Sequence, residues 1–222
     1  MSGGLFVTGT DTNVGKTVLS AALMHRYRPS MPMCYWKPVQ TGFPDDDDTA
    51  VVRELGACAI EEIHNRGVRL PRPLSPHLSA EMSGAQIDLQ AVLGLANISK
   101  GWIVEGAGGV LVPLNGKDLM IDLMAMLRIP VIVMARSALG TINHTLLTLE
   151  ALRARSVPVA GVVMGGETNR ENRRAIETYG RVAVLGEMPC FRELSPRVLG
   201  DWARAELDPA SHLEPLLVGD AR

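Results

Sequence analysis

The chain has 222 residues and a formal net charge of −2, from 22 Lys and Arg against 24 Asp and Glu. A charge this close to zero argues against nucleic-acid binding, which needs a basic surface to neutralise phosphates. Phe, Trp and Tyr occur three times each, which is too few for a platform that stacks single-stranded bases. The length favours one domain, spanning 1–222.

The cysteines and the N-terminus indicate a cellular location. Cys34, Cys58 and Cys190 are far apart and form no C-x-x-C pair, so we expect neither a zinc site nor a disulfide framework. The segment MSGGLFVTG lacks the basic region and long apolar stretch of a signal peptide. The longest apolar runs, such as Val131 to Ala135, are too short to cross a bilayer. We therefore expect a cytoplasmic protein that does not bind membranes.

Short apolar runs alternate with longer helical patterns along the chain. The runs predicted to be strands are Leu5–Thr8, Met33–Trp36, Trp102–Glu105, Val131–Ala135, Val159–Met164 and Val182–Leu185. Helical patterns cover 16–28, 48–56, 85–98, 118–128, 141–154, 170–179, 195–206 and 209–217. The alternation predicts an α/β fold, a doubly wound and mostly parallel sheet flanked by helices. The proline-containing stretch from Arg66 to Ser83 is predicted to be a long surface connection.

The first strand leads into a glycine-rich segment, GTDTNVGKT, at residues 9–17, and then into an apolar helix. This order is typical of the phosphate loop of P-loop NTPases. Backbone N–H groups and the helix start can hold phosphates, Lys16 can reach the β- and γ-phosphate oxygens, and the Thr17 hydroxyl can ligate Mg²⁺. Five residues rather than the usual four separate Gly9 and Gly15. The flanking strand and helix nevertheless favour nucleotide binding.

Two further strand ends carry charged side chains. The strand Met33–Trp36 ends in Lys37, and the strand Trp102–Glu105 ends in the acid itself, followed by glycines at 106, 108 and 109. Because the carboxyl ends of parallel strands meet at the ligand crevice, Lys37 should bring a second ammonium near the phosphates. Glu105 is suited to Mg²⁺, and the glycines let backbone amides face anions.

Six sequence strings taken together resemble the dethiobiotin synthetase family. They are GTDTNVGKT (9–17), KPVQTG (37–42), DDDDTA (45–50), SPHLSA (75–80), VEGAGG (104–109) and LGTINHTLLT (139–148). The similarity extends from about residue 5 to 190, and no single string would suffice for it. The resemblance implies an ATP- and Mg²⁺-dependent carboxylation and ring closure of 7,8-diaminononanoate (diaminopelargonic acid) with CO₂. The product is dethiobiotin, formed through a carbamate and a carbamic-phosphoric anhydride.

The resemblance also implies which residues carry this chemistry. Thr17, Asp48 and Glu105 would hold Mg²⁺, with Asp47 as the alternative to Asp48, and Lys37 and Lys16 would be the catalytic lysines. The nucleotide-binding residues would be Asn13, Val14, Gly15, Lys16, Thr17, Val18, Asp48, Glu105, Gly106, Ala107, Gly108, Gly165, Gly166 and Pro189.

The substrate site follows from the same resemblance. The diamine would contact Thr41, Gly109, Leu139 and Asn143. The helix at 141–154 would lie at the two-fold interface of a homodimer, with its N-terminus near the substrate carboxylate, where a helix end favours an anion. His144 is assigned no catalytic role.

The sequence departs from the family where the nucleotide base would be read. Members that recognise adenine often carry Asn-Asp where this chain has Gly165-Gly166, so two hydrogen bonds to the base edge are expected to be missing. Asn169, four residues after Gly165, is a candidate substitute. The departure predicts weak discrimination among nucleoside triphosphates.

Two other P-loop classes compete with this interpretation. Amide-forming relatives such as the cobyrinic acid diamide synthases need a glutamine-hydrolysing domain with an activated cysteine, for which we expect 222 residues to leave no room. A regulatory ATPase of the MinD/ParA type is the alternative function. Members of that class have a lysine early in the phosphate loop, where this chain has Thr10 and Asp11.

Overall fold

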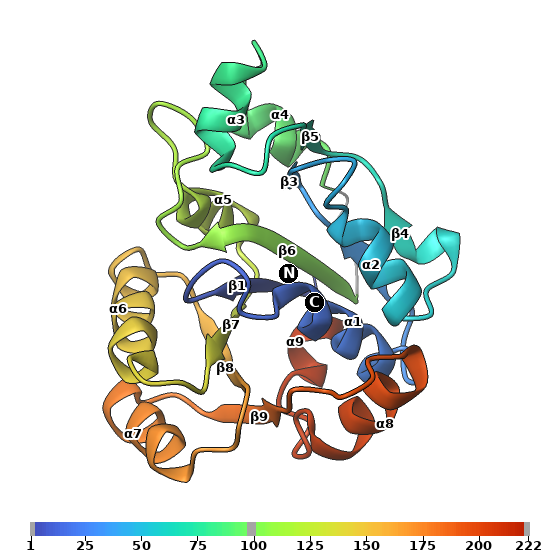
Figure 1. The fold of residues 1–222 in the computed structure, drawn as a ribbon, viewed down its shortest axis with the longest axis vertical. Helices are drawn as coiled ribbons and strands as arrows, with labels where there is room; N and C mark the ends of the chain where they lie inside the picture. The colour runs from blue at the N-terminus through green and yellow to red at the C-terminus, as the bar shows by residue number, and fades with distance from the viewer. Residues whose placement is uncertain (1–2, 97–100, 220–222) are drawn as a thin grey trace.

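The computed structural model describes residues 3–96 and 101–219. Its central sheet has seven parallel strands in the order β4-β2-β6-β1-β7-β8-β9 (Figure 1). Their bounds are β1 Gly4–Gly9, β2 Cys34–Trp36, β4 Ile63–His64, β6 Trp102–Gly109, β7 Val131–Arg136, β8 Val159–Gly165 and β9 Val184–Met188. Two short strands, β3 (Val39–Thr41) and β5 (Val68–Leu70), form a separate parallel pair.

Helices cover the two faces of the sheet (Figure 1). One layer contains α3 (Pro76–Met82), α4 (Leu89–Gly94), α5 (Met120–Leu127), α6 (Thr141–Ala154) and α7 (Arg170–Gly180). The other contains α1 (Lys16–Tyr27), α2 (Asp48–Leu55), α8 (Pro196–Glu206) and α9 (Glu214–Val218). The short 3-10 helix η1 (Ile60–Glu62) precedes β4. Among the described residues, no helix is long and apolar enough to span a membrane.

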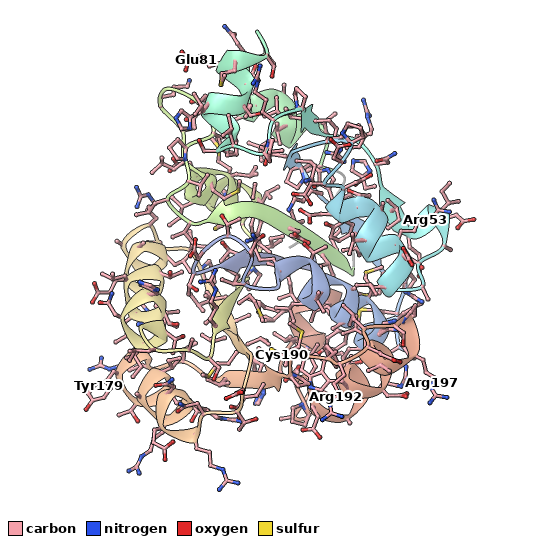
Figure 2. All side chains as sticks on the ribbon, in the orientation of Figure 1. Arg53, Glu81, Tyr179, Cys190, Arg192 and Arg197 are labelled. Carbon is pink, nitrogen blue, oxygen red and sulfur yellow. The ribbon has the colours of Figure 1, made fainter. Side chains whose placement is uncertain are left out.

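Alternation along the buried strands builds two hydrophobic cores. In β1, Leu5 and Val7 pack into the core under α1 and α8, whereas Phe6 points to the opposite core under α5 and α6. All three side chains are fully buried. Successive strand residues face opposite sides, so a strand that is apolar on both sides must be covered by helices on both sides. The predicted doubly wound α/β class is confirmed, and side chains fill the space between the layers (Figure 2).

The predicted elements agree with the structure for the long segments and fail for the short ones. All six predicted strands exist, with β6 continuing to Gly109. The long surface connection predicted from Arg66 to Ser83 is wrong as a loop, because the segment contains β5 and α3. Pro76 is the first residue of α3, where a missing backbone N–H costs nothing, so this proline starts a helix rather than preventing one.

Other corrections concern helix length and non-local pairing. The helix predicted over 85–98 is confined to Leu89–Gly94, because Asp88 caps it by accepting from Gln90 N and Ala91 N; residues 97 and 98 lie outside the described residues. The helix predicted over 209–217 is reduced to α9. Strands β3, β4 and β5 have two or three residues each and depend on distant partners, so local patterns do not reveal them.

The chain order places β1 at the point from which the sheet extends in both directions. β1 pairs with β6 on one side and with β7 on the other, and β2 lies beyond β6. In open parallel sheets, the crevice beyond the carboxyl ends of such strands is where ligands bind. The loops after β1, β2 and β6 therefore meet at one edge of the sheet.

Candidate active site

The loop between β1 and α1 curls around the amino group of Lys16. Lys16 Nζ donates to the carbonyl of Asp11 over 3.0 Å. Gly15, the residue before α1, has a φ of +105°, in the left-handed region where glycine is favoured. At Gly9, a Cβ would lie 2.6 Å from Val14 Cγ2 and 2.8 Å from the carbonyl oxygen of Asp11, so the loop closes only over a glycine.

Four polar side chains from four separate segments meet beside this loop. Thr17 Oγ1 donates to Asp48 Oδ1 over 2.8 Å and lies 3.0 Å from Glu105 Oε1. Lys37 Nζ lies 2.5 Å from Asp48 Oδ2 and 2.8 Å from Glu105 Oε1, and it also donates to the carbonyl of Gly106. The predicted metal-binding and catalytic residues are therefore brought together around one point.

Burial and charge act in opposite directions on these groups. Burial tends to lower the pKa of Lys37, but the carboxylates of Glu105 and Asp48 outweigh it and raise the pKa above its ordinary value. Burial likewise tends to raise the pKa of Asp48, and the ammonium of Lys37 reverses this, so that the pKa is lowered. The pKa of Lys16 is lowered, by burial first and by the charge of Lys37 second. At neutral pH, Lys37 and Asp48 are therefore both ionised.

Two neighbouring aspartates of the run at 45–48, Asp47 and Asp48, have different contacts. Asp47 caps α2 by accepting from Thr49 N and Ala50 N, whereas Asp48, the first residue of α2, points to Thr17 and Lys37. Gln40, a residue that the motif analysis missed, donates to the carbonyls of Thr41 and Asp46, each over 2.8 Å, and accepts from Asp48 N. Gln40 thereby holds the loop before α2 closed, which directs Asp48 toward the phosphate loop.

Two more hydroxyl groups contact Glu105 from the side away from Thr17. Tyr35 OH donates to Glu105 Oε2 over 3.0 Å, and Ser20 Oγ lies 2.8 Å from the same oxygen and 2.9 Å from the carbonyl oxygen of Lys16, the two acceptors for its single proton. Neither residue belongs to the site predicted from the sequence motifs. The sequence spacing nevertheless points to both residues. Ser20 lies one helical turn after Thr17, so the two side chains share a face of the helix. Tyr35 lies two residues before Lys37, so the two side chains lie on the same side of the strand.

Most of the predicted phosphate-site residues line one cavity of about 290 Å³. Of the predicted set, Asn13, Gly15, Lys16, Thr17, Val18, Lys37, Thr41, Asp48, Glu105, Ala107 and Gly108 line it. Gln40 and Asp46 complete the wall beside Thr41. Gly106 follows Glu105 on β6, and a Cβ there would lie 2.9 Å from the ring of Phe6, so the backbone and the packed ring leave no room for a side chain.

A second cavity, of about 470 Å³, lies on the other side of the phosphate loop and contains the residues predicted to surround the nucleotide base. Gly165, Gly166 and Pro189 line it together with Asn13, Val14 and Gly15. Cys190, labelled in Figure 2, follows β9 and is exposed at this cavity. Asn169 does not line it; its side chain accepts from Asn172 N over 2.8 Å and caps α7.

The residues predicted to contact the diamine are divided between two places. Thr41 lines the phosphate cavity, whereas Gly109 lines a separate cavity of about 400 Å³ with His144 and Leu147. Leu139 and Asn143 are exposed near the start of α6 and line neither cavity. Within one chain, the structure does not bring these last two residues to the site.

The oxygen atoms around Lys37 fit a magnesium ion. Mg²⁺ is typically held by one or two carboxylates together with substrate phosphates, and Asp48 Oδ1 and Glu105 Oε1 both lie within 3.0 Å of Thr17 Oγ1. Within residues 3–96 and 101–219, no group of three or more His, Cys, Asp or Glu side chains could hold a metal. A site built from protein carboxylates alone is therefore not offered by this part of the chain, whereas one shared with phosphates is.

Comparison with known proteins provides relatives over most of the chain. The family described as "AAA domain" matches residues 3–198. The ATP-dependent dethiobiotin synthetases BioD of Brucella ovis, Brucella melitensis biotype 2 and Brucella abortus (strain S19) are each 47% identical to this chain over 199 residues. These matches cover 90% of this chain and 92% of the relative.

Solved structures resemble the chain at the level of fold. A ParA family ATPase from Chlorobium tepidum TLS superposes with a TM-score of 0.56 at 12% identity, covering 98% of both chains. The signal recognition particle receptor FtsY from Elizabethkingia anophelis, solved with GDP, gives a TM-score of 0.51 at 12% identity, covering 99% of this chain and 65% of that one. At this identity the likeness extends to the parallel sheet and its helices only.

Proposed function

The chain belongs to the family of ATP-dependent dethiobiotin synthetases, and from that premise we propose how its own residues close the ring of dethiobiotin. The enzyme is a ligase that joins 7,8-diaminononanoate and CO₂ at the expense of ATP. The observation that carries the assignment of residues is the meeting of Thr17, Lys37, Asp48 and Glu105 beside the phosphate loop.

The reaction has three steps, none of which needs a nucleophile from the protein. One amine adds to CO₂ and forms a carbamate. A carbamate oxygen attacks the γ-phosphorus of ATP, the bond from that phosphorus to ADP breaks, and a carbamic-phosphoric anhydride forms. The second amine attacks the carbamate carbon, the C–O bond to phosphate breaks, and the cyclic urea leaves with inorganic phosphate. The protons of the two amines pass to solvent.

The role of the protein is to hold anions together. The carbamate and the γ-phosphate repel each other, and stabilising such charge is the main contribution to catalysis of phosphoryl transfer. Lys16 would contact the β- and γ-phosphates, and Lys37 would stabilise the charge on the carbamate and the transferring phosphoryl group. Both side chains are more than nine-tenths buried, which strengthens their field because little water screens them.

We further propose that Thr17, Asp48 and Glu105 hold Mg²⁺ together with the phosphates. When bound, the ion would supply positive charge that offsets the negative charge of the phosphates. Hard oxygen donors and two carboxylates support this choice of metal over softer ions. Asp47 is a weaker candidate because its carboxylate already accepts two backbone hydrogen bonds of α2.

A homodimer would complete the diamine site. Leu111 and Leu147 are exposed and line the cavity that contains Gly109, and Leu139 is exposed nearby in sequence at the start of α6. Exposed leucines that gather around one helix are typical of a protein–protein interface. In a dimer, Leu139 and Asn143 of one chain could reach the diamine bound by the other, which would explain their distance from the phosphate cavity.

The remaining assignments follow from the same residues. Gly165 and Gly166 have no side chain to offer a nucleotide base, and the Gly165 carbonyl and the Gly166 N–H are already hydrogen-bonded to Ser137 and Met188. This supports weak discrimination among nucleoside triphosphates, with Arg136, Ser137 and Glu167 as the polar side chains that line the same cavity. We propose that residues 1–222 act as one P-loop domain in the cytoplasm, where the three free cysteines would stay reduced.

The decisive test measures ADP and dethiobiotin formation with each substrate omitted in turn. We expect ADP release to require both the diamine and bicarbonate and to match dethiobiotin formation in amount. A basal ATPase that ignores the diamine and responds to a protein partner would instead support a ParA-like switch. The likeness to the ParA structure does not favour that function, since 12% identity supports a shared fold alone.

A further inference from the structure

The two oxygens of Glu105 have separate sets of partners. Oε1 faces the site, with Lys37 Nζ at 2.8 Å and Thr17 Oγ1 at 3.0 Å. Oε2 faces the protein interior, where Ser20 Oγ lies at 2.8 Å and Tyr35 OH at 3.0 Å. The carboxylate has no solvent-exposed surface, so these four groups account for its polar surroundings among the described residues.

We propose that Tyr35 and Ser20 are positioning residues, which hold Glu105 Oε2 so that Oε1 alone is presented to Mg²⁺ and the phosphates. The inference rests on the proposed function, because it assigns to Glu105 the role of metal ligand. Neither hydroxyl touches the phosphate cavity, so both residues act through Glu105.

Glu105 needs positioning residues because the carboxylate of a glutamate side chain can rotate. The last torsion of a glutamate is broad and roughly two-fold, so the carboxylate can rotate unless its oxygens are held. With Oε2 released, both oxygens of Glu105 could turn to the ammonium of Lys37, and neither would keep its direction toward Thr17. Partners that orient a metal-binding carboxylate contribute about 10- to 100-fold to metal affinity or activity.

The two hydroxyls hold fixed positions beside Glu105, and Glu105 Oε2 is the acceptor of the Tyr35 phenol. Ser20 is on α1 and Tyr35 on β2, so they approach Glu105 from a helix and a strand, and both are fully buried. The Tyr35 phenol donates to Glu105 Oε2 over 3.0 Å.

The chain provides a matched control for the removal of this phenol. Tyr27 is also buried, and its hydroxyl donates to the buried carboxylate of Asp208 over 2.5 Å. Tyr35→Phe and Tyr27→Phe therefore remove the same atom from the same kind of hydrogen bond. Only the first change concerns Glu105.

The test is calorimetric titration of ATP binding at a series of Mg²⁺ concentrations, without diamine, so that no turnover occurs. We expect Tyr35→Phe to raise the Mg²⁺ concentration for half-maximal tight binding by about tenfold or more. Binding of ATP without Mg²⁺ should stay at the wild-type level. Tyr27→Phe should reproduce the wild-type Mg²⁺ dependence, and Ser20→Ala should shift it in the same direction as Tyr35→Phe.

The outcomes separate this inference from the function on which it rests. A wild-type Mg²⁺ dependence in both Tyr35→Phe and Ser20→Ala would overturn the positioning role while leaving the proposed function intact. An equal shift in Tyr27→Phe would also overturn it, because the effect would then come from lost stability. A wild-type protein that binds ATP equally with and without Mg²⁺ would instead contradict the proposed metal site. If Tyr35→Phe does not fold, the Mg²⁺ dependence of ATP binding by Ser20→Ala tests the positioning role instead.

Discussion

Replacement of Lys37 by alanine should separate catalysis from nucleotide binding. In the proposed reaction Lys37 acts on charge that develops during phosphoryl transfer, so its loss should lower kcat more than it weakens ATP binding. Removing one well-placed electrostatic group from an active site lowers kcat by about 10²- to 10³-fold. ATP should still bind, because the phosphate loop and Lys16 remain.

The structure also predicts a loss of stability in the absence of ligands. Lys37 Nζ is paired with Asp48 at 2.5 Å and with Glu105 at 2.8 Å. Removing one partner of a buried ion pair costs about 3–5 kcal/mol, because the other charge stays buried without compensation. At about 2–4 °C per kcal/mol for a chain of this size, Tm should fall by about 6–20 °C. Mg²⁺ with ATP should restore part of the loss, since a cation then returns to the two carboxylates.

Three measurements on Lys37→Ala check the reasoning: product formation, calorimetric ATP binding, and thermal unfolding with and without Mg²⁺ and ATP. Lys117→Ala is the matched control, because Lys117 is exposed; its Tm should change by no more than about 2 °C. Dethiobiotin formation by Lys37→Ala at the wild-type rate would refute the catalytic role. An unchanged Tm without ligands would refute the ion-pair argument.

Four further outcomes follow from other parts of the structure. Because the folded pKa of Lys37 is raised and that of Asp48 is lowered, the ion-pair stability is present between their ordinary values of 10.5 and 3.8. This stability is lost as the pH rises through the pKa that Lys37 has in the folded protein, or falls through the pKa that Asp48 has there. The Tm difference between wild type and Lys37→Ala should therefore be present at neutral pH and shrink on acidification, because without Lys37 burial raises the pKa of Asp48 and protonation removes the uncompensated charge of the variant. Asp48→Asn should raise the Mg²⁺ requirement of ATP binding, whereas Asp47→Ala should only cost about 1 kcal/mol as a lost helix cap, measured by denaturant unfolding. Because glycines occupy 165–166, kcat/KM should be comparable for ATP, CTP and GTP, and a strong ATP preference would contradict this. Sedimentation velocity should give a dimer for the wild type and a monomer for Leu147→Glu; a monomeric wild type would contradict the proposed interface.

The sequence predicted the site where charged or glycine residues lie at the end of a buried, strongly apolar strand. Lys16 and Thr17 follow β1, Lys37 follows β2, and Glu105 lies on β6. Parallel strands bring their carboxyl ends together, so strand assignment alone was enough to place these residues near one another. Asp48 belongs to no strand, and its place at the site came from the family resemblance; the structure adds that Gln40 pins the preceding loop.

The parts that the sequence did not reveal depend on pairing between distant segments. Strands β3 and β5 have three residues each and pair with each other although α2, η1 and β4 lie between them in the chain. Ser20 and Tyr35 look like ordinary helix and strand residues until Glu105 is known to lie between them. The proline-containing stretch from Arg66 to Ser83 predicts a connection, but a proline at the first position of a helix is compatible with α3, which begins at Pro76. The helix and strand preferences of a local segment do not predict contacts between segments that are far apart in the chain.

The charge balance of the site explains why the proposed reaction needs a metal ion as well as two lysines. Lys16 and Lys37 are balanced by Asp48 and Glu105, so the formal charges of the four side chains cancel. In this state Lys37 already serves as counter-ion to both carboxylates. A triphosphate and a carbamate add only negative charge, and Lys37 cannot stabilise them fully while it is shared with the two carboxylates. A divalent cation held by Thr17, Asp48 and Glu105 would supply the missing charge and free Lys37 to face the transferring phosphoryl group. The same carboxylates that stabilise the fold through Lys37 would then hold the metal during catalysis, which is why Glu105 must keep a fixed orientation in both states.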